Sequence, residues 1–290
     1  MDWVQQSLVI GLTEQAPLIL AAMGFALIYR LTGLINVAYS ETVTLGAYLG
    51  MWVNTTFGLN FYVTLIPAGI LSGLLSVATY FALFRPAKRR NVGVVELIII
   101  STGLSIFLRY GLQFVFGYTY RYYEVPPPNT IKVLGVGVSS FRLIALGSVL
   151  ALALILYWFI QKTNFGIRIR ALAGDEKLAE VSGINPLAVT VLIWFIAGVA
   201  GGLAGAFYGV GSSVKPWLGW EQFLFILLVV LIGGAKNIRG VLLAGLGTGV
   251  LLAALTLKLG NALYSQVALI ALFIIILALR GDRSAEAGKV

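Results

Sequence analysis

The chain has 290 residues, of which 59% are hydrophobic and 11% are charged, whereas a typical soluble domain carries roughly a quarter charged residues. With a mean hydropathy of +0.96 and neither cysteine nor histidine, this composition excludes an ordinary soluble domain, disulfide or thiol chemistry, histidine-ligated metal sites and imidazole catalysis. The formal net charge of +9 is spread over the connections between apolar runs, which argues against a nucleic-acid partner.

Apolar runs long enough to cross a hydrocarbon core of ~30 Å recur along the whole chain. They predict an all-α polytopic membrane protein with about 8–9 transmembrane helices, since 36–56 and 221–235 fit either complete spans or broken, re-entrant segments. The whole chain, 1–290, is expected to form one transmembrane domain with a disordered tail, 281–290. The expected spans are 7–29, 36–56, 61–84, 94–117, 141–161, 187–211, 221–235, 240–258 and 262–280.

Lysines and arginines gather on the connections of one side, including a cluster after the third run and Arg168 and Arg170 after the fifth. The positive-inside rule therefore predicts a cytoplasmic C-terminus and an external N-terminus. Asp2 stands where a signal peptide carries basic residues, so no cleavable signal is expected.

The first candidate site is a polar patch in the second run, Asn36-Val37-Ala38-Tyr39-Ser40-Glu41-Thr42. An ionised residue at the centre of a membrane helix costs roughly 2.5–3.5 kcal/mol on insertion scales, so Glu41 requires polar surroundings. A cavity wall and a structural hydrogen-bond network fit this patch equally well.

Four further ionisable residues fall within apolar runs: Glu14, Glu96, Arg109 and Glu221. The last three lie near span ends, where a long side chain reaches the interface, so we expect them to snorkel. Glu96 and Arg109 occupy different faces of one helix and are not expected to pair with each other. The longest external connection, 117–140, contains three prolines, which exclude a helix there.

Sequence elements of catalysis are missing from the chain. It has no Gly-x-Ser-x-Gly element and no Walker A loop. We therefore expect no enzymatic activity and no cofactor or metal in this chain, and if ATP drives transport, a partner hydrolyses it. An ion-coupled transporter that uses Glu41 and Glu96 stays as an alternative, although no inverted repeat is evident.

A polar cassette, Thr163 to Pro186, separates two long apolar runs. Its sequence, TNFGIRIRALAGDEKLAEVSGINP, predicts a short helix from Ala171 to Ser182 that ends at Gly183. Because this polar segment cannot lie in hydrocarbon, it must lie in water or against another protein. We expect it to be a cytoplasmic docking element.

Glycines recur every four residues in several runs, which aligns them on one helix face and lets helix backbones approach closely. Tight packing is the expected role, and a sliding or pore-lining interface is the alternative. The main stripe comprises Gly198, Gly201, Gly202, Gly205 and Gly209.

Several segments, taken in order, resemble one family. AAMGFALIYRLTGLINVAYSETVTLGAY (21–48) is similar to the pattern A-x-G-x-x-L-I-Y-G-x-x-x-x-I-N-F-A-H-G-E-x-x-x-L-G-A-Y, and the cassette is similar to T-x-x-G-x-x-x-R-A-x-A-x-D followed by GIN. The basic segment at 85–90, the segment STGLS at 101–105, FIAGVAGGLAGAFYG and LIGGAKNIRGVLLAGLG complete the likeness. The chain resembles the permease subunits of ABC importers for branched-chain and related neutral amino acids, especially the shorter of their two permeases. Departures from the usual residues occur at Arg30, Val37, Tyr39, Ser40 and Lys236.

The resemblance implies a complex of two permeases, two cytoplasmic ATPases that bind ATP and Mg, and an external solute-binding protein, in a bacterial-type plasma (inner) membrane. This chain would form half of the translocation path, and the cassette would dock into an ATPase. Urea or short amides are alternative substrates. The implied coupling residues are Arg170, Asp175, Glu176, Ala179 and Gly183, and the implied path residues are Asn36, Tyr39, Ser40, Glu41 and Thr102.

Overall fold

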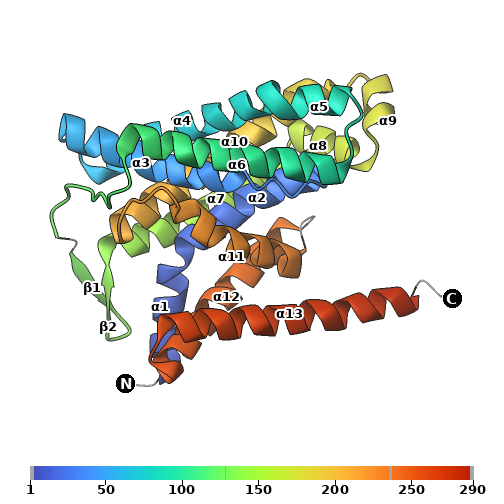
Figure 1. Cartoon of the computed structure of the whole chain (residues 1–290). Coiled ribbons are helices and arrows are strands. Elements are labelled where there is room, and N and C mark those ends of the chain that lie inside the picture. Colours follow the sequence, from blue (N-terminus) through green and yellow to red (C-terminus); the bar gives the residue numbers. More distant parts are fainter. Residues whose placement is uncertain (1–2, 128, 235–236, 288–290) are drawn as a thin grey trace.

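The computed structural model of the chain describes residues 3–127, 129–234 and 237–287 (Figure 1). The described chain is helical apart from its connections and one small hairpin. Its elements are α1 Trp3–Glu14, α2 Ala16–Thr32, α3 Tyr39–Phe57, α4 Phe61–Thr79, the π-helical turn η1 Tyr80–Phe84, α5 Arg85–Arg89, α6 Val94–Phe116, β1 Thr130–Val133, β2 Val136–Ser139, α7 Ser140–Lys162, α8 Asn164–Gly174, α9 Glu176–Val181, α10 Pro186–Gly211, α11 Leu218–Gly233, α12 Ile238–Leu259 and α13 Ala262–Ala287.

The predicted apolar runs coincide with helices, and the prediction of an all-α chain is confirmed. In the described residues, five helices are long and apolar enough to cross a membrane: the continuous helix Phe61–Arg89, α6, α7, α10 and α12. The bent pair α1 and α2 makes a sixth candidate. α11 has 16 residues and is about 24 Å long, shorter than a hydrocarbon core of ~30 Å. The exact number of spans therefore stays a prediction.

The first predicted span, 7–29, is two helices rather than one. α1 ends at Glu14, α2 begins at Ala16, and the two helices are bent by 51°. Pro17 lies in the first turn of α2, where its ring would clash with the carbonyl of the residue four positions earlier in a straight helix. The proline therefore accounts for the interruption, which corrects the prediction of a continuous span.

The glycine stripe of α10 lies where this helix packs against its neighbours α2, α3 and α4. A Cβ added at Gly198 would lie 2.7 Å from the Ser72 carbonyl oxygen in α4, and one at Gly205 would lie 1.8 Å from the Val43 carbonyl oxygen in α3. The helix backbones approach this closely because no side chain intervenes. The other three stripe members contact α3, α4 and the connection after α6, respectively: Gly201, Gly202 and Gly209.

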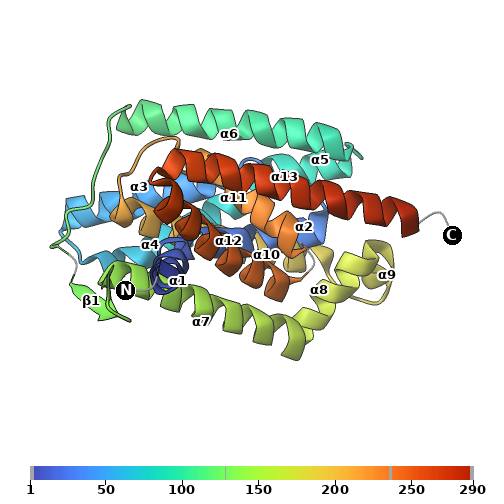
Figure 2. The same ribbon diagram turned by 90° about the horizontal axis from the view of Figure 1, so that it is seen from below.

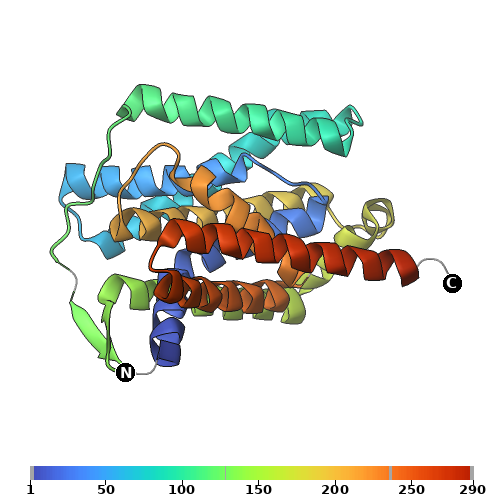
Figure 3. The same ribbon diagram turned by 60° about the horizontal axis from the view of Figure 1, so that its bottom comes forward.

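Two helices lie at the edges of the bundle. α6 packs mainly against α3, and α13 packs mainly against α12 (Figures 2 and 3). α6 exposes large apolar side chains, among them Phe107 and Phe114, which are 72% and 93% exposed. Apolar exposure on this scale is expected of a surface that faces lipid or another membrane subunit.

The two ends of the bundle carry different structures. α5, α8, α9 and the C-terminal end of α13 lie at one end, whereas the β1–β2 hairpin and the start of α1 lie at the other (Figures 1 and 2). The predicted cytoplasmic segments thus share one end and the predicted external segments share the opposite end.

An antiparallel hairpin in the connection after α6 was not foreseen. β1 and β2 pair through Val133 and Val136, and the turn residues Leu134 and Gly135 both have positive φ, +48° and +82°. Such a two-residue turn matches the twist of paired strands. The prolines exclude a helix upstream, but they do not prevent strands in the β-branched segments that follow them.

The tail also differs from its prediction. α13 extends through Ala287, so residues 281–287, expected to be disordered, are helical. Arginine, alanine and glutamate are good helix formers, and adding residues to an existing helix avoids the cost of starting a new one. The last three residues, 288–290, lie outside the described residues.

Candidate functional site

The polar patch predicted in the second run lies at the start of α3. α2 ends at Thr32, and the following Gly33 has a φ of +66°, which glycine favours. The next residues lead through a turn to Tyr39, where α3 begins. Ser40 and Glu41 therefore occupy the first turn of α3, where the helix dipole favours a negative charge.

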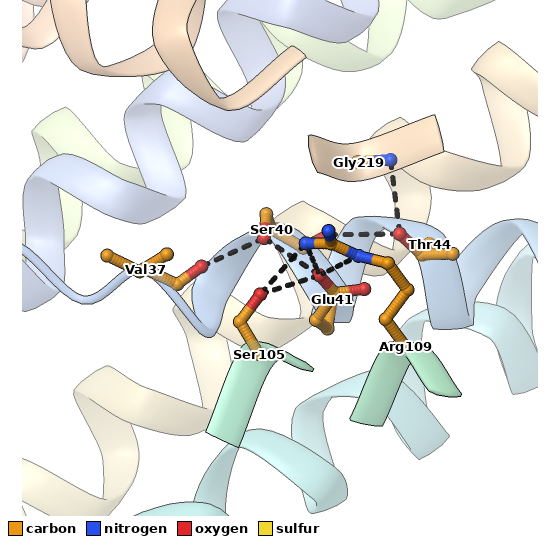
Figure 4. A network of polar contacts seen from close by, with 7 residues as sticks. All are labelled: Val37, Ser40, Glu41, Thr44, Ser105, Arg109 and Gly219. Carbon is orange, nitrogen blue, oxygen red and sulfur yellow. Dashed lines mark hydrogen bonds and ion pairs between the residues drawn. The ribbon is translucent and has the colours of Figure 1, made fainter. Parts of the chain in front are cut away.

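Glu41 forms an ion pair with Arg109 of α6. The distance from Arg109 Nη2 to Glu41 Oε1 is 2.8 Å, and Arg109 Nε lies 3.3 Å from the same oxygen (Figure 4). The Glu41 side chain is 0% exposed and that of Arg109 is 16% exposed. A carboxylate that is fully removed from solvent requires such a partner. The snorkelling arrangement expected for Arg109 is therefore wrong.

Neighbouring hydroxyls complete this polar network. Ser105 Oγ donates to Glu41 Oε1 at 2.8 Å and accepts from Arg109 Nη2 at 3.1 Å. Ser40 Oγ donates to the Val37 carbonyl at 2.8 Å, and its oxygen lies 3.3 Å from Glu41 Oε1 (Figure 4). Three polar groups thus converge on one carboxylate oxygen.

The α6 side of the network was missed by the sequence analysis. Ser101, Ser105, Arg109 and Gln113 follow one another at four-residue spacing, which places them on one face of α6. The Val37 N–H donates to Ser101 Oγ at 3.1 Å, which ties this face to the chain just before α3. The spacing was the signal that could have found these residues.

Helix α11 contacts the same region. The Gly219 N–H donates to Thr44 Oγ1 at 3.1 Å, and a Cβ at Gly219 would lie 1.9 Å from the Ser40 carbonyl oxygen (Figure 4). The Arg109 guanidinium lies 4.4 Å from the centre of the Trp220 ring, which is a cation–π distance. Arg109 therefore lies between a buried carboxylate and a partly exposed tryptophan.

Not every predicted path residue joins this network. The Tyr39 hydroxyl lies 3.0 Å from the Ala21 carbonyl oxygen and 3.1 Å from that of Ala197, so Tyr39 connects α2 and α10 instead. Thr102 donates to the Ile98 carbonyl of its own helix at 2.9 Å. Asn36 is buried close to the start of α3, 3% exposed.

Several buried polar atoms of α6, α3 and the chain just before α3 have no hydrogen-bond partner among the described residues. A buried acceptor without a partner costs free energy, so each marks a place where a further donor would be stabilising. These atoms are Asn36 Oδ1, Glu41 Oε2, Tyr48 Oη and Gln113 Oε1.

The cassette forms two short helices instead of the single helix predicted from Ala171 to Ser182. α8 ends at Gly174, and Asp175 caps α9 by accepting a hydrogen bond from the Leu178 N–H at 3.0 Å. Aspartate at an N-cap satisfies a backbone donor that lacks a helical partner. The prediction overlooked the pair Gly174-Asp175, because glycine favours the end of one helix and aspartate the start of the next.

The cassette presents its apolar residues on two sides. Ala179 is buried, 3% exposed, whereas Leu178 and Val181 are 66% and 86% exposed. Gly183 follows α9 with a φ of +81°, and the N–H of Ile184 donates to the Ala179 carbonyl at 3.1 Å, which closes the helix. α9 thus packs through Ala179 and offers Leu178 and Val181 outward.

Two predicted coupling residues contact the rest of this chain. Glu176 accepts from Lys88 Nζ of α5 at 2.6 Å, and both side chains are largely exposed. Arg170 donates to the Ile160 carbonyl at the end of α7. α5, α7 and the cassette are therefore connected at one end of the bundle.

A hollow of about 670 Å³ lies at the opposite end of the bundle, beside the α1–α2 break. Glu14 and Arg142 line it and form an ion pair at 2.8 Å, so the charge of Glu14, like that of Glu41, is balanced by an arginine.

The buried Tyr123 phenol, in the connection after α6, donates a hydrogen bond to the Ala47 carbonyl at 3.1 Å. Burial raises the pKa of Tyr123, so it stays a donor at neutral pH.

Comparison with known proteins gives the family. The family described as branched-chain amino acid transport system / permease component matches residues 7–277. The chain belongs to this family. The permease is 26% identical over 252 residues to the probable branched-chain amino acid transport permease protein LivH of Methanocaldococcus jannaschii, covering 84% of this chain and 79% of that protein.

A second relative and one solved structure extend the comparison. The permease is 27% identical to the high-affinity branched-chain amino acid transport system permease protein LivH of Salmonella typhimurium, covering 92% of this chain and 90% of that protein. It also resembles a chain in the structure of PsaBC from Streptococcus pneumoniae in complex with Fab, with a TM-score of 0.50, 16% identity, and coverage of 95% and 91%. That last likeness concerns the fold alone.

Proposed function

We propose that this permease is a transmembrane subunit of an ATP-driven ABC importer and forms half of a path for neutral or branched-chain amino acids. The observation that carries the proposal is the family match over residues 7–277. The partners in this proposal are a second permease, two cytoplasmic ATPases and an external solute-binding protein. The proposed setting is a bacterial-type plasma membrane with eight or nine spans, an external N-terminus and a cytoplasmic C-terminus.

The α3–α6 contact is the part of this chain that we assign to the path. Glu41 Oε2 is a buried acceptor with no donor among the described residues, and the Arg109 side chain retains 16% exposure. The ammonium group of a solute can donate a hydrogen bond to Glu41 Oε2, and the carboxylate of a solute can compete with Glu41 for the Arg109 guanidinium. An amino acid carries both groups, which fits this pair better than urea or a short amide does.

We assign the coupling role to the outer face of α9. Leu178 and Val181 are exposed on α9, at the end of the bundle predicted to be cytoplasmic. Large apolar side chains that face water there are unfavourable unless another protein covers them. An ATPase that covers them gains apolar burial, and its movement then reaches α10 through the packed Ala179 side of α9.

Val181→Asp is expected to reduce ATP-driven uptake at least tenfold while leaving the thermal unfolding midpoint within about 2 °C of the original protein, since surface substitutions alter stability little. Uptake in proteoliposomes that contain the complete complex, and unfolding of the isolated chain, are the two measurements. Lys162→Gln, which lowers the charge by the same single unit at an exposed position outside the cassette, is the matched control. Normal uptake by Val181→Asp would remove α9 from the coupling interface.

Glu176→Lys is expected to abolish uptake. The ion pair with Lys88 allows a test of whether uptake is lost through a contact with an ATPase or through the α5–α9 contact. Because Lys88 is the partner of Glu176 within this chain, the exchanged pair Lys88→Glu/Glu176→Lys restores the internal contact with its polarity reversed. If Glu176 faces an ATPase, the exchanged pair stays inactive. Recovery of uptake by the exchanged pair would mean that Glu176 serves only the α5–α9 contact.

Reconstitution tests the function as a whole. The permease, combined with the proposed ATPases, second permease and binding protein, is expected to take up labelled leucine only with ATP. Unlabelled valine should compete, whereas urea and acetamide should not. Uptake that persists without the ATPases and collapses with an ionophore would favour the ion-coupled alternative.

A further inference from the structure

Three arginines surround a small hollow at the end of the continuous α4–α5 helix. The hollow has a volume of about 250 Å³ and is lined by Phe81, Arg85, Pro86, Arg89 and Arg90. Arg89 and Arg90 are exposed, and the half-buried Arg85 has its guanidinium 5.3 Å from the centre of the Phe81 ring. The hollow is large enough for a phosphate group and is bordered by cations.

These arginines have no acidic partner in the part of the chain whose side chains the structure describes. Between residues 3 and 276, leaving out 128, 161, 235 and 236, no carboxylate lies within ion-pairing distance of Arg85, Arg89 or Arg90, whereas Lys88 of the same helix pairs with Glu176. Neighbouring cations without a counter-ion repel one another, and a bound anion removes this repulsion. Guanidinium groups bind phosphate oxygens with paired N–H donors, which makes phosphate the matching chemistry.

An exposed apolar stripe leads along the same helix toward the hollow. Ile66, Ile70 and Leu74 are 62%, 46% and 53% exposed, and their four-residue spacing places them on one side of α4. Phe81, which is 39% exposed, lies in the π-helical turn η1 between this stripe and the arginines. Figure 1 shows α4 and α5 in line along the edge of the bundle. Leu74 lies 11 residues before Arg85, about 16 Å along the helix, and so within one leaflet of a hydrocarbon core of ~30 Å, whereas Ile66 lies near the opposite face. A ligand with an anionic head and one apolar tail matches the hollow together with Phe81 and Leu74.

We propose that this surface binds one anionic phospholipid, with its phosphate at Arg85, Arg89 and Arg90 and an acyl chain along Phe81 and Leu74. Basic pockets beside membrane helices on the cytoplasmic side suit such headgroups. Because Lys88 links α5 to Glu176, a lipid that orders α5 also restrains α9. The binding itself does not depend on what the permease transports.

Native mass spectrometry of the full-length chain in detergent tests the proposal. Phosphatidylglycerol and phosphatidylcholine with identical acyl chains are titrated separately, and we expect one phosphatidylglycerol to be retained at least tenfold more tightly. Arg89→Gln and Arg90→Gln are each expected to weaken its retention about fivefold, and the double variant about 25-fold. Lys162→Gln removes one exposed cation from the last turn of α7, outside the hollow, and should change retention less than twofold.

Three results would overturn the assignment. Equal retention of the two lipids would exclude headgroup recognition, and equal losses for Arg89→Gln and Lys162→Gln would leave only a general effect of net charge. Displacement of phosphatidylglycerol by inorganic phosphate at matched concentration would identify a site for the free anion. Size-exclusion profiles of the variants verify that these exposed substitutions leave the fold intact.

Discussion

Replacing Arg109 with glutamine is expected to destabilise the permease by about 3–5 kcal/mol, because it leaves the Glu41 carboxylate buried without its cation. The loss can be followed as a lowered thermal unfolding midpoint in detergent. The partly exposed pair Lys215 and Glu221 is the control, since Lys215→Gln removes a partly solvated contact and should cost at most about 1 kcal/mol. A change in Arg109→Gln no larger than that of Lys215→Gln would contradict a buried ion pair.

The double variant Glu41→Gln/Arg109→Gln separates the two interpretations of the polar patch. It removes both charges and keeps groups that can hydrogen-bond Ser105, so stability should recover by at least half of the Arg109→Gln loss. If Glu41 and Arg109 bind the solute, uptake stays at least tenfold below normal although the protein is stable. Recovery of both stability and uptake would make the pair a structural network only.

Replacing Gly205 with alanine is expected to give a large packing defect where α10 contacts α3 inside the bundle. Its new Cβ would lie 1.8 Å from the Val43 carbonyl oxygen, and a backbone atom cannot turn aside as a side chain can. α3 and α10 must then separate, so we expect a loss of about 3 kcal/mol, at the upper end of ordinary overpacking. Reduced monodisperse yield and a lower unfolding midpoint are the measurements.

Gly103→Ala provides the matched comparison for Gly205→Ala. Gly103 lies in the middle of α6, and a Cβ added there would have no neighbouring atom of the described residues within 4 Å outside its own helical surroundings. The substitution should change stability by less than about 1 kcal/mol, and in the stabilising direction, because alanine is the better helix former. Similar losses for the two variants would show that an added methyl group destabilises the chain wherever it is placed, and that the α3–α10 approach is not the cause.

Hydropathy is sufficient to predict the helices but not the contacts between them. A run such as 94–117 predicts α6 almost to the residue, because length and apolar composition are local properties of the chain. Arg109 and Glu41 are 68 positions apart, and their pairing depends on how α3 and α6 are placed against each other. Local patterns contain no information about that placement, so the ion pair could not be predicted although both residues stand out in the sequence.

The interruptions are harder to predict than the helices. Pro17 is visible in the first run, yet a proline near the centre of an apolar segment is compatible with a kinked span as well as with two helices. Asp175 is likewise compatible with one continuous helix, because its capping role depends on the backbone turning at Gly174. The sequence shows which residues can interrupt a helix or carry a charge, and the fold determines which groups those residues contact.

The Tyr39 hydroxyl stands between carbonyl groups of two different helices. It lies within hydrogen-bond distance of two carbonyls, those of Ala21 in α2 and Ala197 in α10, yet a phenol carries a single proton to donate. At any instant one carbonyl receives the proton and the other does not. The hydroxyl therefore ties α2 and α10 to the start of α3 through a single proton that two acceptors share.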